Sequence, residues 1–208
     1  MTKEEKVQEI IKRLSKIYPH PRTALHYEKP WELLVATMMA AQTTDKLVNT
    51  LTPDLFKKFP TIQAFADAPA EEIAEMIAKV NFHSNKAKNI KAAAQMIMEK
   101  FDGKVPDTMV DLDALPGVAR KTANVVLGDA FGKTEGIVVD THVIRLSNKL
   151  GLTTQKDPVK IEQDLMQIVP RNKWFPFPHM LTLYGREYCP ARPHDEKTCP
   201  LNDLYITK

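Results

Sequence analysis

The chain has 208 residues, of which 43% are hydrophobic and 26% charged, and its formal net charge is +3. This composition is typical of a globular protein and excludes a disordered chain. Because the net charge is small, nucleic-acid binding would have to come from a local basic patch. Two cysteines are too few for a disulfide framework, and the longest apolar run, 33–41, is too short to cross a bilayer. With the charged N-terminal segment, these features predict a cytoplasmic protein that does not span a membrane.

Apolar residues recur at helical spacing along most of the chain. Three clear stripes run over 7–17, 90–101 and 161–169. Further helices are expected at about 31–42, 44–58, 70–79, 107–113, 119–131 and 141–150. Strand patterns are nearly absent, so the prediction is an all-α fold of about ten helices. The breaks between them fall near 18–22, 104–106, 132–136 and 151–157, and a proline-rich tail is expected from Pro176.

The segment LPGVARKTANVVLGDAFGKTEGIVVDTH, residues 115–142, carries most of the chemistry. Pro116 and Gly117 favour a tight turn just before a helix, where outward-pointing amides can bind an anion. An ordinary turn between two helices is the simpler explanation of this motif alone. Arg120 and Lys121 favour the anion site, because they place positive charge where a phosphodiester would lie. Leu115 and Val118 are expected to anchor the turn in the core.

Lys121 and Asp140 are candidate catalytic groups. The positive end of the helix dipole and the adjacent Arg120 favour the neutral amine that a Schiff-base nucleophile needs, although most exposed lysines are only solvated. Asp140 precedes a helical run, so capping that helix is its simplest role. Capping would also hold the carboxylate still, and a fixed carboxylate could stabilise positive charge that develops on a sugar.

These motifs closely resemble the helix-hairpin-helix DNA glycosylases of the endonuclease III type. The resemblance covers nearly the whole chain and includes WELLVATMMAAQTTDKLVN, NFHSNKAKNI, LPGVARKTANVVL, VDTHVIRLSNKLG and MLTLYGREYC. It implies a bifunctional DNA glycosylase and AP lyase of base excision repair, with Lys121 as nucleophile and Asp140 as activating carboxylate. The implied substrate is double-stranded DNA with oxidised pyrimidines or abasic sites, and β-elimination would cut the strand 3′ to the lesion. The sequence does not identify the preferred lesion.

The resemblance also implies a set of DNA-binding residues: Gln42, Phe82, Gly117, Val118, Ala119, Arg120 and His142. Gln42 matches the residue that fills the space left by an extruded nucleotide. Phe82 aligns with an apolar wedge, and core packing is an equally good explanation of it. Asp45 and His142 are expected near the site, in capping, positioning or phosphate contact. Ala119 replaces a second glycine of the hairpin and is expected to be the first helical residue.

The tail departs from the family. Most relatives carry four cysteines, spaced C-x6-C-x2-C-x5-C, that bind a [4Fe–4S] cluster. In this frame the chain has Cys189, Glu196, Cys199 and Tyr205, so no cluster and no other metal is predicted. The spacing gives little support to a zinc site that uses His179 or His194. Prolines and apolar contacts, with Leu201, Leu204 and Tyr205 filling the space, are expected to hold the loop.

The family fold implies two helical lobes. One comprises residues 22–135 and ends in the hairpin, and the other combines 1–21 with 136–208. A monomer is expected, in the cytoplasm and at the nucleoid if the source is bacterial. Two alternatives remain open: a monofunctional glycosylase of the same superfamily, which Lys121 disfavours, and a non-catalytic helix-hairpin-helix DNA-binding module. A binding module would need neither Asp140 nor Gln42.

Overall fold

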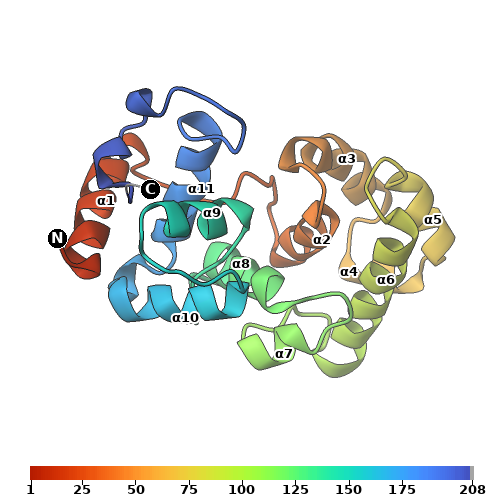
Figure 1. Ribbon diagram of the computed structural model, residues 1–208. Helices are drawn as coiled ribbons and strands as arrows, with labels where there is room; N and C mark the ends of the chain where they lie inside the picture. Colours follow the sequence, from red (N-terminus) through yellow and green to blue (C-terminus); the bar gives the residue numbers. More distant parts are fainter. Residues whose placement is uncertain (207–208) are drawn as a thin grey trace. The chain divides into compact units, whose positions relative to one another are not determined.

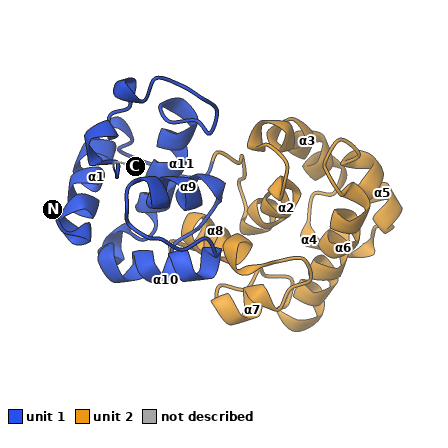
Figure 2. Ribbon diagram, viewed as in Figure 1, with its two compact units in different colours: residues 1–23, 134–208 blue, residues 24–133 orange. Residues whose placement is uncertain are grey.

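A computed structural model describes residues 1–206, and within that range all regular secondary structure is helical (Figure 1). The all-α prediction is therefore confirmed. The chain forms two compact units (Figure 2). Unit 1 comprises Met1–Thr23 and the chain from Thr134 onward, and unit 2 is Ala24–Lys133. No helix in the described part of the chain has the length and apolar character needed to cross a membrane.

Unit 2 is built around one buried helix, α2. Proline stands at the first helical position of α2, and the Glu32 side chain accepts from the backbone amides of residues 28 and 29. Because α2 is apolar on nearly all sides, other helices cover it: α3, α6 and α8 pack against it. The helices of this unit are α2 (Pro30–Ala40), α3 (Asp45–Lys58), α4 (Ile62–Asp67), α5 (Ala70–Met76), α6 (His83–Lys100), α7 (Met109–Asp113) and α8 (Arg120–Phe131).

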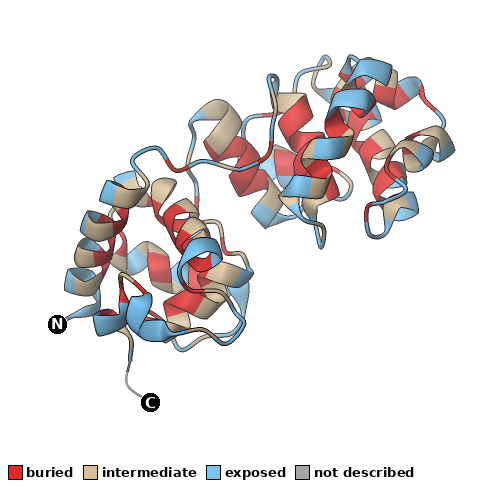
Figure 3. Ribbon diagram, turned by 90° about the horizontal axis from the view of Figure 1, so that it is seen from above, coloured by how far each residue is buried: buried red, intermediate tan, exposed pale blue. Residues whose placement is uncertain are grey.

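Unit 1 combines the first helix of the chain with its last third. Buried residues line the inward faces of its helices (Figure 3), and Val7, Ile10 and Leu14 of the first helix are fully buried in this core. Leu201 and Leu204 belong to the same core, which confirms that apolar contacts hold the C-terminal loop. The elements are α1 (Lys3–Ile17), α9 (Thr141–Lys149), α10 (Pro158–Ile168), η1 (Arg171–Lys173), α11 (Pro176–Glu187), η2 (Glu196–Thr198) and η3 (Asn202–Leu204).

Two helices differ from the sequence expectation. The predicted proline-rich tail from Pro176 is wrong, because α11 begins at that residue. Prolines are tolerated there because the first amides of a helix have no acceptor within the helix. Helix α4 is only six residues long, too short to show a stripe, and begins where the Thr61 side chain accepts from the amide of Ala64.

Candidate active site

The hairpin at 115–118 is tightly packed against α6. The backbone of Gly117 has a φ of +75°, and a Cβ there would lie 2.7 Å from the Cβ of Asn89 on α6. Only glycine satisfies both the left-handed conformation and the close approach. The Val118 amide donates to the Leu115 carbonyl at 3.1 Å, and both side chains are buried, as predicted. The hairpin is therefore fixed to unit 2, while Gly117 itself is exposed.

Helix α8 begins immediately after the hairpin. Its first residue is Arg120, and Ala119 is the N-cap, with φ −101° and ψ 165°. The expectation that Ala119 is the first helical residue is thus wrong by one position, and alanine is unstrained there because its φ is negative. Arg120 and Lys121 are both exposed. The start of α8 therefore presents a primary amine next to helix-terminal amides, an arrangement suited to a phosphate-bearing substrate.

Gln42 and Phe82 share an unusual backbone conformation. Both are left-handed, with φ of +56° and +58°, although neither is glycine. Gln42 follows α2 and is exposed, and Phe82 precedes α6 with 64% of its surface exposed. Core packing is therefore the wrong explanation for Phe82. An exposed aromatic side chain on a constrained turn is what a wedge between bases requires.

Polar contacts join the Gln42 turn to the start of α6. Asn81 donates from Nδ2 to the carbonyl of Gln42 at 2.6 Å. The Nζ of Lys86, a nearly buried residue, donates to the carbonyls of Met39, at 2.7 Å, and of Ala41. Met39 lies in the last turn of α2 and Ala41 follows its last residue. The ammonium therefore caps the C-terminal end of that helix and holds the turn after it. Burial lowers the pKa of Lys86 below its ordinary value.

Asp140 is held by both of its carboxylate oxygens. One accepts from the amide of Val143 at 2.8 Å, which confirms the predicted cap of α9. The other accepts from the hydroxyl of Thr182 on α11 at 3.0 Å. The carboxylate is half-buried and has little freedom to rotate. It is therefore a fixed negative charge in unit 1.

His142 packs next to Asp140 in the first turn of α9. A Cβ at Gly185 would lie 2.6 Å from its Nδ1, so the absence of a side chain at Gly185 makes room for the imidazole. Burial lowers the pKa of His142, although the charge of Asp140 acts in the opposite direction. The expected capping role of Asp45 is wrong, because the side chain of Thr44 caps α3 and Asp45 is the first helical residue.

The C-terminal loop brings together Cys189, His194 and Cys199, which the spacing did not predict. The hydroxyl groups of Tyr205 and Tyr184 share a hydrogen bond. A [4Fe–4S] cluster needs four thiolates, and this loop offers two thiols, one imidazole and a phenol. The donor set therefore does not fit the cluster that the family resemblance implies.

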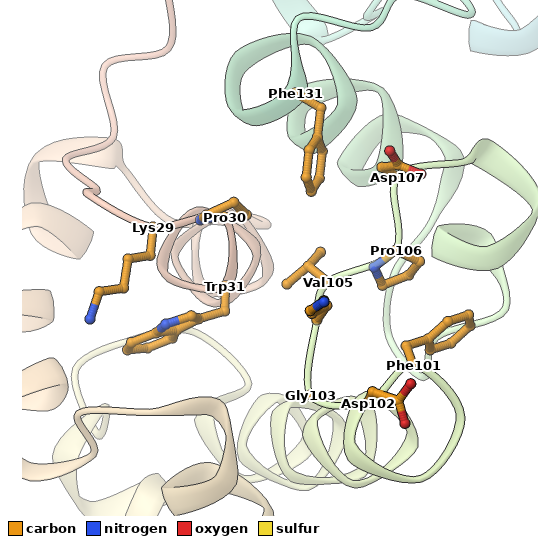
Figure 4. Close-up of a pocket in the computed structure, with 11 residues that line it drawn as sticks. Lys29, Pro30, Trp31, Phe101, Asp102, Gly103, Val105, Pro106, Asp107 and Phe131 are labelled. Carbon is orange, nitrogen blue, oxygen red and sulfur yellow. The ribbon is translucent and has the colours of Figure 1, made fainter.

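A pocket of about 640 Å³ lies elsewhere in unit 2, between the start of α2 and the segment that follows α6 (Figure 4). Trp31, Val105 and Phe131 give it an apolar wall. The residues that line it include none of the predicted site residues. The candidate site is therefore exposed turns and helix ends rather than this pocket.

The chain belongs to the HhH-GPD superfamily of base excision DNA repair proteins, whose family model matches residues 35–171. Within this superfamily, the chain is similar to endonuclease III proteins. The endonuclease III of Synechocystis sp. is 49% identical over 92% of this chain and 87% of its own length. That of Escherichia coli (strain K12) is 38% identical over 94% of this chain and 92% of its own length. A solved structure of a trapped covalent endonuclease III–DNA intermediate superimposes with a TM-score of 0.92, at 37% identity over 99% of this chain and 96% of that chain.

Several supporting residues were missed by the sequence reasoning. Lys86 could have been found, because it lies four positions before Ile90 and so falls on the buried face of α6. A lysine in an apolar stripe signals a buried cation with a specific partner. Asn81, Asn89 and Thr182 carry no such signal, since their contacts join residues distant in sequence.

Proposed function

We propose that the chain is a bifunctional DNA glycosylase and AP lyase of base excision repair, with Lys121 as its nucleophile and Asp140 as its activating carboxylate. The observation that carries the assignment of Lys121 is its exposed amine at the start of α8, directly behind a hairpin that only glycine can close. An exposed amine behind backbone amides can reach a sugar whose phosphate those amides bind. The lysine separates this reaction from simple hydrolysis of the glycosidic bond.

The reaction proceeds in two stages. The Nζ of Lys121 attacks C1′ of the damaged nucleotide, the C1′–N bond breaks, and the base leaves after taking up a proton. Asp140 stabilises the positive charge that develops on the sugar, which a carboxylate fixed at both oxygens does without reorganising. The nitrogen loses a proton, the C1′–O4′ bond breaks as O4′ takes up a proton, and the opened sugar is held as a Schiff base. This Schiff base acidifies the C2′ proton. Loss of that proton breaks the C3′–O bond and cuts the strand 3′ to the lesion.

The partner is double-stranded DNA that carries a damaged base or an abasic site. The target nucleotide has to leave the stack, so its place must be filled. The left-handed turns of Gln42 and Phe82, joined by Asn81 and Lys86, support them as the filler and the wedge. Gly117, Val118, Ala119 and Arg120 are proposed to contact the DNA backbone, and His142 to lie near it. Oxidised pyrimidines are the proposed lesion class.

We further propose that units 1 and 2 are the two lobes of this glycosylase and that it acts as a monomer without a [4Fe–4S] cluster. The donor set at Cys189 and Cys199 supports the absence of the cluster. Because the substrate is DNA, the proposed location is the cytoplasm, at the nucleoid in a bacterial cell.

Borohydride trapping on DNA with an abasic site tests the assignment. The wild type should form a covalent adduct, and Lys121→Ala should form none. Lys57→Ala, which removes an exposed lysine of the same unit, should trap like the wild type. An adduct with Lys121→Ala would contradict the proposed nucleophile. Base release without an adduct in the wild type would make the protein a monofunctional glycosylase.

Asp140→Asn separates an enzyme from a binding module. It should keep DNA affinity and the cap of α9, since asparagine also caps helices, but lose turnover. A duplex panel of oxidised pyrimidines, scored separately for base release and strand cleavage, identifies the lesion. Unchanged turnover in Asp140→Asn would contradict the role of this carboxylate.

A further inference from the structure

Three potential metal ligands converge in the loop after α11. Cys189, His194 and Cys199 each offer one ligand atom, and these atoms all lie within 4.8 Å of one another. The Sγ of Cys199 is 3.4 Å from the Nε2 of His194. Both cysteines are buried and His194 is half-buried, so these three side chains lie at the edge of the unit 1 core. The proposed glycosylase chemistry uses none of these groups.

The imidazole of His194 is oriented as in a metal ligand. Its Nδ1 is 2.9 Å from the carbonyl of Arg192, which can only accept a hydrogen bond. The Nδ1 therefore carries a proton, and in the neutral imidazole the lone pair of Nε2 faces the sulfur of Cys199. This is the usual arrangement of a metal-binding histidine, in which a backbone carbonyl fixes the tautomer.

Two cationic side chains contact the sulfur of Cys189. Its sulfur lies 3.6 Å from a guanidinium nitrogen of Arg145 and 3.7 Å from the Nζ of Lys149. A second guanidinium nitrogen of Arg145 donates to the carbonyl of Cys189 at 2.6 Å and fixes the start of the loop.

We propose that Cys189, His194 and Cys199 bind one zinc ion, in place of the [4Fe–4S] cluster that the family resemblance implies. In a tetrahedral zinc site, with Zn–S of about 2.3 Å and Zn–N of about 2.0 Å, sulfur and nitrogen ligands are about 3.5 Å apart. The observed separation of Cys199 and His194 is 3.4 Å. Two sulfurs with one imidazole favour zinc over magnesium or calcium, which prefer oxygen ligands.

Zinc binding is a ligand exchange without a redox step. In its thiol form Cys199 donates to the carbonyl of Tyr188 at 3.1 Å, and this proton is released to solvent when the sulfur binds the ion. A thiol proton on Cys189 leaves in the same way, and a water molecule takes the fourth position. Because the folded loop alone brings the three ligands together, the ion stabilises this loop against unfolding.

Metal analysis of the reduced wild-type protein tests the proposal. After incubation with zinc and desalting, it should retain about one zinc per chain. Cobalt as a substitute should give thiolate-to-metal charge-transfer absorption, which reports sulfur ligands directly. A strong chelator should remove the ion and lower the melting temperature, and added zinc should restore it.

Variants assign the ligands. Cys199→Ser and Cys189→Ser should lose the stoichiometric zinc and the cobalt charge-transfer band. Since Cys189→Ser and Cys199→Ser alter a core, His194→Gln at its edge is the safer variant and should weaken zinc binding by on the order of 100-fold or more. The exposed His20 provides a matched control, because His20→Gln also removes one imidazole and should bind zinc like the wild type.

The proposal is overturned if the wild type holds no zinc after this loading. It is also overturned if His194→Gln and His20→Gln bind zinc equally well, or if purified protein contains iron and acid-labile sulfide. None of these outcomes bears on Lys121 trapping, so the zinc site and the proposed function are tested independently.

Discussion

Replacing Gly117 by alanine should destabilise unit 2 for two separable reasons. The first is the left-handed backbone, with a φ of +75°, which costs an L-residue about 1–2 kcal/mol. The second is the contact that the new Cβ would make with the Cβ of Asn89, at 2.7 Å. That atom is attached to the backbone of α6 and cannot rotate away, so the hairpin itself has to move. Forcing extra atoms into packed structure typically costs about 1–3 kcal/mol.

Gly132 provides a matched control in the same unit. Its φ is +64°, close to that of Gly117, but a Cβ there would meet no atom within 4 Å. Gly132→Ala should therefore cost only the conformational strain, about 1 kcal/mol after the entropy lost by the unfolded chain is subtracted. Gly117→Ala should cost about 1–3 kcal/mol more than Gly132→Ala.

Denaturant unfolding, followed by circular dichroism, measures both variants. A second substitution, Asn89→Gly, removes the clashing atom and should recover part of the loss caused by Gly117→Ala, beyond its own cost of about 1 kcal/mol as a helix glycine. Affinity for abasic-site DNA should fall more for Gly117→Ala than for Gly132→Ala, because only the former displaces the hairpin. Equal unfolding free energies for the two variants would refute the packing argument.

Three further predictions concern positioning and pH. Lys86→Met keeps the buried stem but leaves the carbonyls of Met39 and Ala41, at the end of α2, without their donor. The free energy of unfolding should fall by about 2–4 kcal/mol and the trapping rate should decrease, while Lys88→Met, an exposed control, should change neither. Thr182→Val should cost about 1–2 kcal/mol and slow single-turnover base release without weakening DNA binding, since Asp140 loses one of two restraints; an unchanged rate would contradict this role. Burial lowers the pKa of His142, so the unfolded chain takes up a proton more readily and stability is lost as the pH falls below about 6.5. His142→Gln should lose less stability than the wild type between about pH 7 and pH 5 in urea unfolding, and an equal loss would contradict this assignment.

The sequence predicted the elements that follow simple periodicity. The stripes over 7–17 and 90–101 correspond to α1 and to the second half of α6, where buried residues recur at helical spacing. The helix that starts at Pro176 is not predicted from the sequence, because prolines usually mark a break. In its first turn, however, Pro176 and Pro178 stand at positions that need no amide donor. Proline position within a helix, rather than proline count, decides the outcome.

The candidate site was predicted through residue types with direct chemistry, such as Lys121 and Asp140. Their supports could not be predicted, because Thr182 lies 42 positions from Asp140 and Asn89 reaches Gly117 only through tertiary packing. The left-handed backbone at Gln42 and Phe82 could not be predicted from the sequence either, because residues other than glycine rarely adopt this conformation. Local propensities carry no information about a conformation that distant contacts impose.

Within unit 2, helix α6 is the common support of the proposed DNA contacts. Phe82 lies immediately before its first residue, Lys86 in its second turn holds the turn that carries Gln42, and Asn89 fixes the hairpin. Lys86 and Asn89 are three positions apart and share one face of the helix, and Phe82 stands at its N-cap. A shift of α6 would therefore displace the wedge, the filler and the hairpin together. Because a rigid element carries all three, their mutual spacing is set by the fold of unit 2 before any DNA is bound, which lowers the entropy cost of forming the complex.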